Sequence, residues 1–279
     1  MSEWQPSTEV VEDRVTAFSA GSLHDLFDSA GPAPADGDAL PVLWHWLAFL
    51  PKFPQAQMSA DGHPRTGGFL PPLDGRRRMY AGGKVSVEGR PVIGETLTRT
   101  SRVTDVVEKV GRSGSLLFVT VEHEVVGAEG RIRDRQDIVY KHASTGSVER
   151  TIAPDLDDDA IWAGERSTAT PVLFRYSAIT YNAHRIHYDR DYATGVEGYP
   201  GLVVHGPMQA MWLADAAQQA RPGSRITGFG FRSVAPAFDG DPVQLRVRTS
   251  DEPEVLGLAA YSGGTKTMVA TARFEGEQA

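Results

Sequence analysis

The chain shows the same order of elements twice, an apolar segment of helical length followed by a run of β-rich segments, and this repetition constrains the fold most. In the first half, segment 41–50 precedes β-rich runs at 78–85, 92–103, 116–126 and 132–141. In the second half, segment 208–220 precedes runs at 226–234, 243–250, 255–261 and 265–274. Their β-branched and aromatic residues indicate strands. We therefore predict an internal duplication with an α+β fold, in which each half wraps a curved antiparallel sheet around a helix.

Composition divides the chain between these halves. Residues 143–170 are rich in Ser, Thr and Pro and include the acidic run 155–159, which favours a solvated linker. We expect an N-terminal half over 1–145, a linker over 146–170 and a C-terminal half over 171–279. We also expect the first 30 residues to form a helical lead-in, and 171–180 to form a strand that ends in a polar loop.

Charge and composition exclude several classes of protein. The formal net charge of −8 argues against a nucleic-acid partner, because phosphate recognition needs a basic surface. The lack of cysteine excludes disulfides, thiolate metal sites and cysteine nucleophiles. The longest apolar run, 41–50, is too short to span a bilayer, and no secretory signal pattern is visible. We therefore expect a soluble, cytoplasmic protein with no membrane partner.

The polar stretch 180–187 carries the residues best suited to chemistry, because it places Asn182 five residues before His187. A histidine titrates near neutrality, at about 6.5 when unperturbed, and can act as base and acid. An amide takes no proton at neutral pH, so we assign proton transfer to His187 and the orientation of a water or hydroxyl to Asn182. Gly206 stands where the second helix should begin, so its backbone N–H suits a developing oxyanion.

Each of these residues has a structural alternative. His187 could simply be tied to the backbone, and Asn182 could cap a turn. His184, His187 and His205 suggest a metal site, but no carboxylate completes a ligand triad at a familiar spacing, so we predict no metal. Arg185 lies in the same loop and could meet a carboxylate or a phosphate, or could lie in solvent.

The residues around this motif resemble a known family. The MaoC-like, R-specific enoyl-CoA hydratases carry a histidine that follows Ile and precedes Ala by six positions, as His187 does here with Ile186 and Ala193. They also carry a string similar to 203–206 just before their central helix. The strings at 67–73 and 76–83 are similar to one branch, which contains mesaconyl-CoA hydratases, itaconyl-CoA hydratases and 3-hydroxyacyl-thioester dehydratases.

This resemblance covers about the whole chain and implies a double hotdog fold, one active site per chain and a homodimer. It implies a non-catalytic N-terminal half that forms part of the substrate cleft, and a C-terminal half that carries the catalytic residues. The implied substrate contacts come from Arg185, His184, His205 and Val204. The general family has an aspartate where this chain has Asn182, which leaves the simple two-base mechanism without its second base.

The activity implied by the resemblance is that of a hydro-lyase on acyl-CoA thioesters, with no separate cofactor because coenzyme A is part of the substrate. A short branched or dicarboxylic enoyl-CoA is favoured, since Arg65, Arg76–Arg78 and Arg185 could meet a second carboxylate. The alternatives are a 3-hydroxyacyl-thioester dehydratase of fatty-acid metabolism, an acyl-CoA thioesterase that uses Asp189, and a non-catalytic acyl-CoA binding protein.

Overall fold

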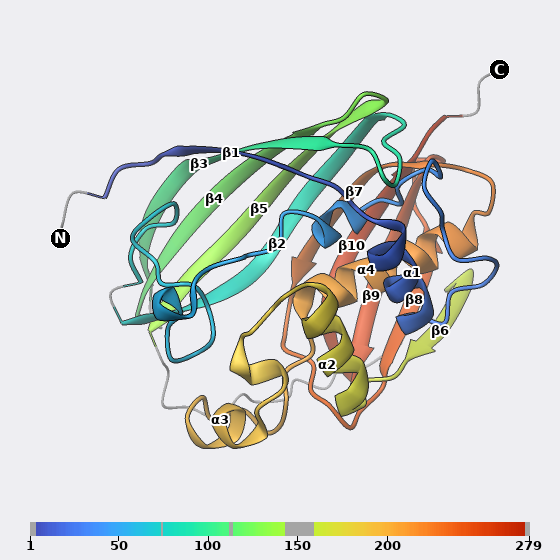
Figure 1. The fold of residues 1–279 in the computed structure, drawn as a ribbon. Helices are drawn as coiled ribbons and strands as arrows, with labels where there is room; N and C mark the ends of the chain where they lie inside the picture. Colours follow the sequence, from blue (N-terminus) through green and yellow to red (C-terminus); the bar gives the residue numbers. More distant parts are fainter. Residues whose placement is uncertain (1–3, 74, 112–113, 143–158, 277–279) are drawn as a thin grey trace.

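The computed structural model describes residues 4–73, 75–111, 114–142 and 159–276. Within this part of the chain, ten strands form one antiparallel sheet in the order β1-β3-β4-β5-β2-β7-β10-β9-β8-β6 (Figure 1). The N-terminal strands are β1 (Thr8–Asp13), β2 (Arg76–Gly89), β3 (Leu97–Gly111), β4 (Gly114–Val126) and β5 (Gly130–His142). The C-terminal strands are β6 (Trp162–Arg166), β7 (Ile226–Ser233), β8 (Val243–Thr249), β9 (Val255–Ser262) and β10 (Thr265–Phe274). The eight strand segments predicted to follow the two helical segments are confirmed.

The helices lie mainly over the C-terminal half (Figure 1). They are α1 (Ala17–Leu26), α2 (Thr170–Ile179), α3 (Arg190–Gly195) and α4 (Gly206–Ala220), with 3-10 turns η1 (Trp44–Leu47), η2 (Gln55–Gln57) and η3 (Arg185–His187). None of these described helices is long and apolar enough to cross a membrane.

The two halves are joined through β2 and β7, which pair from Gly82↔Arg232 to Ser86↔Gly228. Two glycines permit this close contact. A Cβ on Gly82 would lie 2.5 Å from the carbonyl oxygen of Phe231, and one on Gly83 would lie 2.6 Å from that of Arg135. Glycine therefore makes one continuous sheet possible at the join.

The C-terminal half has the predicted helix. Helix α4 packs against β6 to β10, and most of its residues are buried, including Met208, Met211 and Trp212. Alanines fill much of the remaining contact surface, which lets the helix approach the sheet closely. The helix begins at Gly206, with a proline in its first turn, where a missing N–H costs little.

The N-terminal half lacks the helix that we predicted over 41–50. Only the turn η1 forms there, because Leu43 (φ 71°) and Phe49 (φ 57°) adopt left-handed backbone conformations on either side of it. The turn is held by the buried Asp134 of β5, whose Oδ2 accepts from the Trp46 indole N–H at 2.8 Å and lies 3.2 Å from His45 Nε2. Among the described residues, no helix packs against β1 to β5 as α4 packs against β6 to β10.

Three other local predictions are wrong. Residues 8–13 form β1 and pair with β3, so the helical lead-in is confined to α1. Residues 171–180 lie in helix α2 instead of a strand; its buried Leu173, Tyr176 and Ser177 have helical spacing. Strand β6 lies inside the predicted linker and pairs with β8. Most of the acidic run, at 155–158, lies outside the described residues.

Candidate active site

The polar motif lies against a loop from the other half of the chain. The N–H of Arg185 donates to the carbonyl oxygen of Asp61 at 2.9 Å, and Arg185 Nη1 donates to that of Ala60 at 3.2 Å. Gly62, with φ of 89°, approaches so closely that a Cβ would lie 1.8 Å from the carbonyl oxygen of Ala183. A larger residue cannot occupy this position without displacing the loop, so both halves contribute to one site.

His187 is held in a single tautomer. It ends the turn η3 with 8% of its surface exposed, and its Nδ1 lies 2.7 Å from the carbonyl oxygen of Val203. A carbonyl oxygen can only accept, so Nδ1 carries the proton and Nε2 keeps its lone pair. Burial lowers the pKa of His187 to about 4, although the bond to Val203 opposes the shift. The ring is therefore neutral at pH 7 and able to accept a proton.

His205 supports His187 from behind. The two rings stack with centroids 3.7 Å apart and planes inclined by 19°. His205 has no exposed surface, its Nε2 lies 2.9 Å from Ser177 Oγ, and burial holds its pKa well below the ordinary range. Val204 is likewise buried, with its N–H bound to the Ala237 carbonyl oxygen. Both residues are thus buried, which leaves them little surface for the substrate contacts that we expected of them.

The start of α4 lies next to these rings, because His205 is its N-cap residue. The first N–H groups of a helix have no partner within the helix, and the helix dipole favours negative charge there. A Cβ on Gly206 would lie 3.9 Å from both Tyr80 Cδ1 and Ser233 Oγ, so strands β2 and β7 both face this end of the helix. The geometry suits binding of an oxyanion at Gly206.

Asn182 adopts the turn-capping arrangement. Its Oδ1 accepts a hydrogen bond from the N–H of His184 at 3.0 Å, the pattern of an Asx turn. We had expected the carbonyl oxygen to bind a water while the NH2 group was held by the protein. The structure uses the oxygen for the turn instead, which leaves the NH2 group as the part of the side chain that can reach a ligand.

Arg185 is engaged within the protein. Its Nε and Nη2 lie 3.0 Å and 2.8 Å from Asp189 Oδ2, and its guanidinium lies 4.1 Å from the centroid of the Tyr192 ring. Asp189 also accepts from the backbone N–H of Tyr192, as the N-cap of α3. Arg185 therefore holds the two loops together, and Asp189 is unsuited to activate water for thioester hydrolysis.

The three consecutive arginines of β2 differ in their partners. Arg76 pairs with Glu108 at 2.6 Å, and Arg77 pairs with Glu197 at 2.8 Å. The backbone of the half-buried Arg78 pairs with Tyr140 of β5, but its guanidinium makes no hydrogen bond or ion pair to another described residue. Burial lowers its pKa, and the nearby Asp61 opposes this shift. Arg78 is thus the member of the run whose charge is available to a ligand beside the site.

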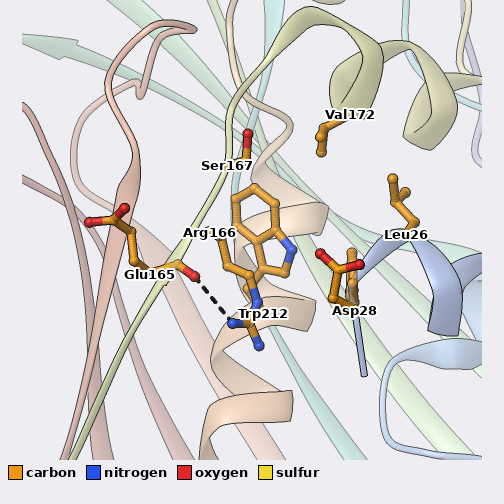
Figure 2. A pocket seen from close by; sticks show the side chains of 8 residues that line it. Leu26, Asp28, Glu165, Arg166, Ser167, Val172 and Trp212 are labelled. Atoms are coloured by element: carbon orange, nitrogen blue, oxygen red, sulfur yellow. Dashed lines mark hydrogen bonds between the residues drawn. The ribbon is translucent and has the colours of Figure 1, made fainter. Parts of the chain in front are cut away.

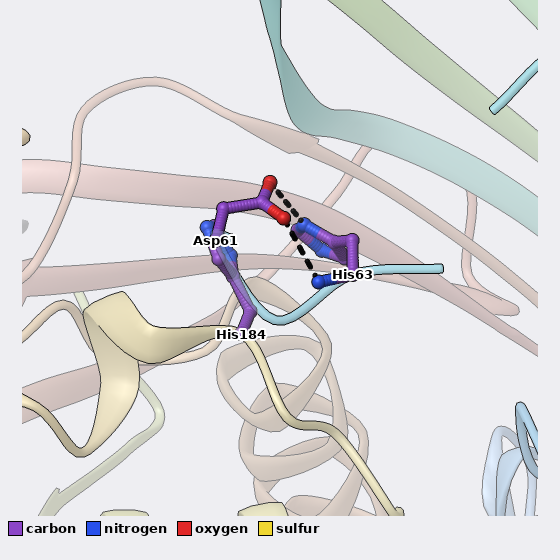
Figure 3. Close-up of side chains that lie close together, drawn as sticks. All are labelled: Asp61, His63 and His184. Atoms are coloured by element: carbon purple, nitrogen blue, oxygen red, sulfur yellow. Dashed lines mark hydrogen bonds and ion pairs between the residues drawn. The ribbon is translucent and has the colours of Figure 1, made fainter. Parts of the chain in front are cut away.

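The sequence analysis missed two residues of the N-terminal loop, Asp61 and His63. His63 Nδ1 lies 3.0 Å from Asp61 Oδ2, the N–H of His63 donates to Asp61 Oδ1 at 2.9 Å, and the ring lies 3.9 Å from that of His184 (Figure 3). The only local signal was a pair of polar residues around a glycine. Nothing near them in the sequence indicates that this loop meets the motif.

Asp61, His63 and His184 offer ligand atoms that lie within 4.8 Å of one another. A carboxylate thus lies beside one histidine of the motif, at a sequence separation that no familiar ligand spacing indicates. However, both Asp61 oxygens already accept hydrogen bonds, from Ser59 and His63. The positive charge of Arg78 also bears on His63 and His184. This combination favours proton transfer or ligand binding over a bound cation.

A separate cleft of about 270 Å³ lies among α1, β6, α2 and α4 (Figure 2). Trp212, Val172 and Leu26 form its apolar wall, and Arg166 reaches Asp215 at 2.7 Å nearby. No histidine lines it, and it shares no lining residue with the site around His187. Its described lining includes the carboxylates of Asp28 and Glu165 but no residue of the polar motif, so it is separate from the candidate site.

Comparison with known proteins agrees with this geometry. Residues 43–239 match the family described as Hydroxyacyl-thioester dehydratase type 2. The chain is 39% identical over 279 residues to the Mesaconyl-C(4)-CoA hydratase of Chloroflexus aurantiacus, and the match covers 94% of each chain.

Solved structures show the fold. A MaoC-like dehydratase superposes with a TM-score of 0.69 at 14% identity, over 98% of both chains. A Mycobacterium tuberculosis protein described as a double hotdog superposes with a TM-score of 0.57 at 12% identity, over 99% of this chain and 97% of the other. The chain has a double hotdog fold.

Proposed function

The chain belongs to the MaoC-like family of type 2 hydroxyacyl-thioester dehydratases and is a hydro-lyase of acyl thioesters, and on this premise we propose that it hydrates a short branched or dicarboxylic enoyl-CoA of the mesaconyl or itaconyl type. The bond from His187 Nδ1 to Val203 carries the proposal for the chemistry, because it leaves a neutral Nε2 as base beside the start of α4.

In the proposed reaction, the oxygen of a water bonds to Cβ of the enoyl thioester as His187 Nε2 takes one of its protons. The π electrons of the double bond move onto the thioester oxygen, which the Gly206 N–H stabilises as an enolate. The carbonyl then re-forms as Cα takes the proton back from His187. One water is added and His187 is regenerated. The Asn182 NH2 group is available to donate a hydrogen bond to the water oxygen.

Two observations support a dicarboxylic substrate. The relative that is 39% identical is named for mesaconyl-C(4)-CoA. The half-buried guanidinium of Arg78 has no ion-pair partner among the described residues and lies beside His63 and His184. A guanidinium binds a carboxylate through two parallel hydrogen bonds, which would hold the free carboxylate of such a substrate.

A second candidate is the dehydration of 3-hydroxyacyl thioesters in fatty-acid metabolism. The name of the matched family supports it, and so does the N-terminal sheet, which no described helix covers. A long acyl chain needs apolar surface of this kind. In this case Arg78 would contact the thioester carrier rather than the acyl group.

The experiment is to incubate the protein with crotonyl-, long-chain enoyl-, mesaconyl- and itaconyl-CoA. Loss of the conjugated absorbance is followed together with mass. A gain of one water on the dicarboxylic substrates alone supports the proposal, whereas hydration of linear substrates alone favours the second candidate. Release of free coenzyme A without hydration would contradict both. The homodimer and the assignment of the halves to 1–145 and 171–279 remain proposals, and sedimentation would test the former.

A further inference from the structure

The Asp61–His63 pair has no part in the reaction described so far, yet its loop is docked against the catalytic motif. Gly62, between the two residues, contacts the backbone of Ala183, and the His63 ring lies 3.9 Å from that of His184. The His184 ring in turn meets the His187 ring edge-on at 5.4 Å. His184 is therefore in ring contact with both His63 and His187.

The pair has one hydrogen-bonding arrangement. Burial acts to raise the pKa of Asp61, but hydrogen bonds from His63 and Ser59 outweigh this effect and hold the pKa below its ordinary value. The carboxyl is therefore ionised. A carboxylate can only accept, so His63 Nδ1 carries the proton and its Nε2 keeps a lone pair. Burial and the charge of Arg78 lower the pKa of His63, although Asp61 opposes the shift. His63 is thus neutral, with the same free nitrogen as His187.

The water that adds to Cβ needs two hydrogen-bond acceptors. A water has two O–H donors, and His187 Nε2 accepts one of them in the proposed reaction. The Asn182 oxygen, the acceptor expected for the second, is held in the turn by the His184 N–H and has one lone pair left. The His184 ring has no hydrogen bond to another described residue that would fix its tautomer. His63 Nε2, with its tautomer fixed by Asp61, remains for this role.

We propose that His63 binds the second O–H of the water that His187 deprotonates, and that Asp61 is the positioning residue that fixes its ring. In the reverse reaction, His187 takes the proton from Cα and passes it to the 3-hydroxyl oxygen as the Cβ–O bond breaks, while the O–H of that hydroxyl stays hydrogen-bonded to His63 Nε2, so one water leaves. His63 keeps its own charge throughout. The water is then held by acceptors from both halves of the chain, in place of the aspartate that the general family carries at Asn182. This inference rests on the proposed hydratase function.

The test compares His63→Phe, which removes the acceptor, with His63→Gln, whose amide oxygen can replace it. Loss of a fixed hydrogen bond to the reacting atoms costs about 10²- to 10³-fold in rate. We expect kcat of His63→Phe to fall by about 10²-fold with KM changed less than about threefold. His63→Gln should recover about tenfold of that loss. Gln57→Ala, an exposed side chain at the start of the same loop, is the matched control and should retain wild-type kcat.

Three results would overturn the proposal: wild-type kcat in His63→Phe, a loss confined to KM, or equal losses in both His63 variants together with a lowered Tm. The last would show a purely structural role. Wild-type hydration of at least one enoyl-CoA is the reference for these comparisons. If the wild-type protein hydrates none, the proposed function itself fails, and this result is distinct from a failure of the His63 variants.

Discussion

The two halves of the described sheet contribute five strands each, but different elements lie against them. Helix α4 packs on β6 to β10. On the N-terminal strands, loop 59–73 takes this place, with Phe69, Leu70 and Leu73 packed against the cluster that contains Val119 and Tyr140. A helix presents backbone N–H groups at a fixed end, whereas a loop can present side chains. The difference indicates how one fold, used twice, can supply an oxyanion site from one half and Asp61 and His63 from the other.

The first prediction tests whether the C-terminal half carries the essential base. His187→Gln should lower kcat by about 10²- to 10⁴-fold, because its amide cannot take a proton from water. His123→Gln is the matched control in the N-terminal half, since burial also lowers the pKa of His123 to about 4. That variant should hydrate enoyl-CoA at the wild-type rate. Equal rates for the two variants would remove His187 from the mechanism.

The second prediction concerns the charge that the N-terminal half places beside the site. Arg78→Met should lower kcat/KM for a dicarboxylic enoyl-CoA by about 10- to 100-fold, the usual effect of losing a charged hydrogen bond. Crotonyl-CoA, which has no second carboxylate, should be hydrated almost as before. Arg76→Met is the control, because Arg76 is already paired with Glu108. An equal loss on both substrates would show that Arg78 binds coenzyme A or supports the loop.

The third prediction breaks the contact between the halves. Gly62→Ala places a Cβ 1.8 Å from the Ala183 carbonyl oxygen and strains a backbone with φ of 89°. The loop must move, so we expect kcat to fall by about tenfold and Tm by a few degrees, as for strain of about 1–3 kcal/mol. Gly68→Ala in the same loop meets no atom within 4 Å and should change neither. Wild-type kinetics in Gly62→Ala would mean that the docked loop is unnecessary for catalysis.

Local patterns predicted the parts of the molecule that depend on local residues. The run 208–220 and the Gly206-Pro start defined α4, and period and composition defined the long strands. Segment 171–180 was mistaken for a strand because Val172 and Phe174 favour sheets, while the spacing of its buried residues is helical. Segment 41–50 forms a turn instead of a helix, and this turn is held by Asp134, which is distant in the sequence. Tertiary contacts decided both cases.

The site shows the same limit. The Asn182–His187 motif and Gly206 lie close together in the sequence, so their proximity was predictable. His63 reaches His184 only because its loop docks against the polar motif, and no periodicity in the sequence reports such a contact. Arg78 could not be separated from Arg76 and Arg77 until their partners were known.

The smallest expected effect is the response of the two halves to acid. His187 and His123 each have a folded-state pKa of about 4, below the ordinary value of about 6.5 that applies when the chain is unfolded. Between these values the unfolded chain binds more protons than the folded one, so the free energy of unfolding falls as the pH drops from 6.5 towards 4.

Each histidine should contribute about 1 kcal/mol of this loss between about pH 6.5 and 5.5. Thermal unfolding of His187→Gln and His123→Gln at these two pH values should therefore show a smaller drop in Tm than the wild type. The activity of the wild type sharpens the comparison, because of these two histidines only His187 has to stay unprotonated in the proposed reaction. If His187 is the base, kcat/KM should stay constant as the pH falls below 6.5, both in the wild type and in His123→Gln. A fall in kcat/KM with a midpoint near pH 6.5 would show that the base is a solvated histidine instead.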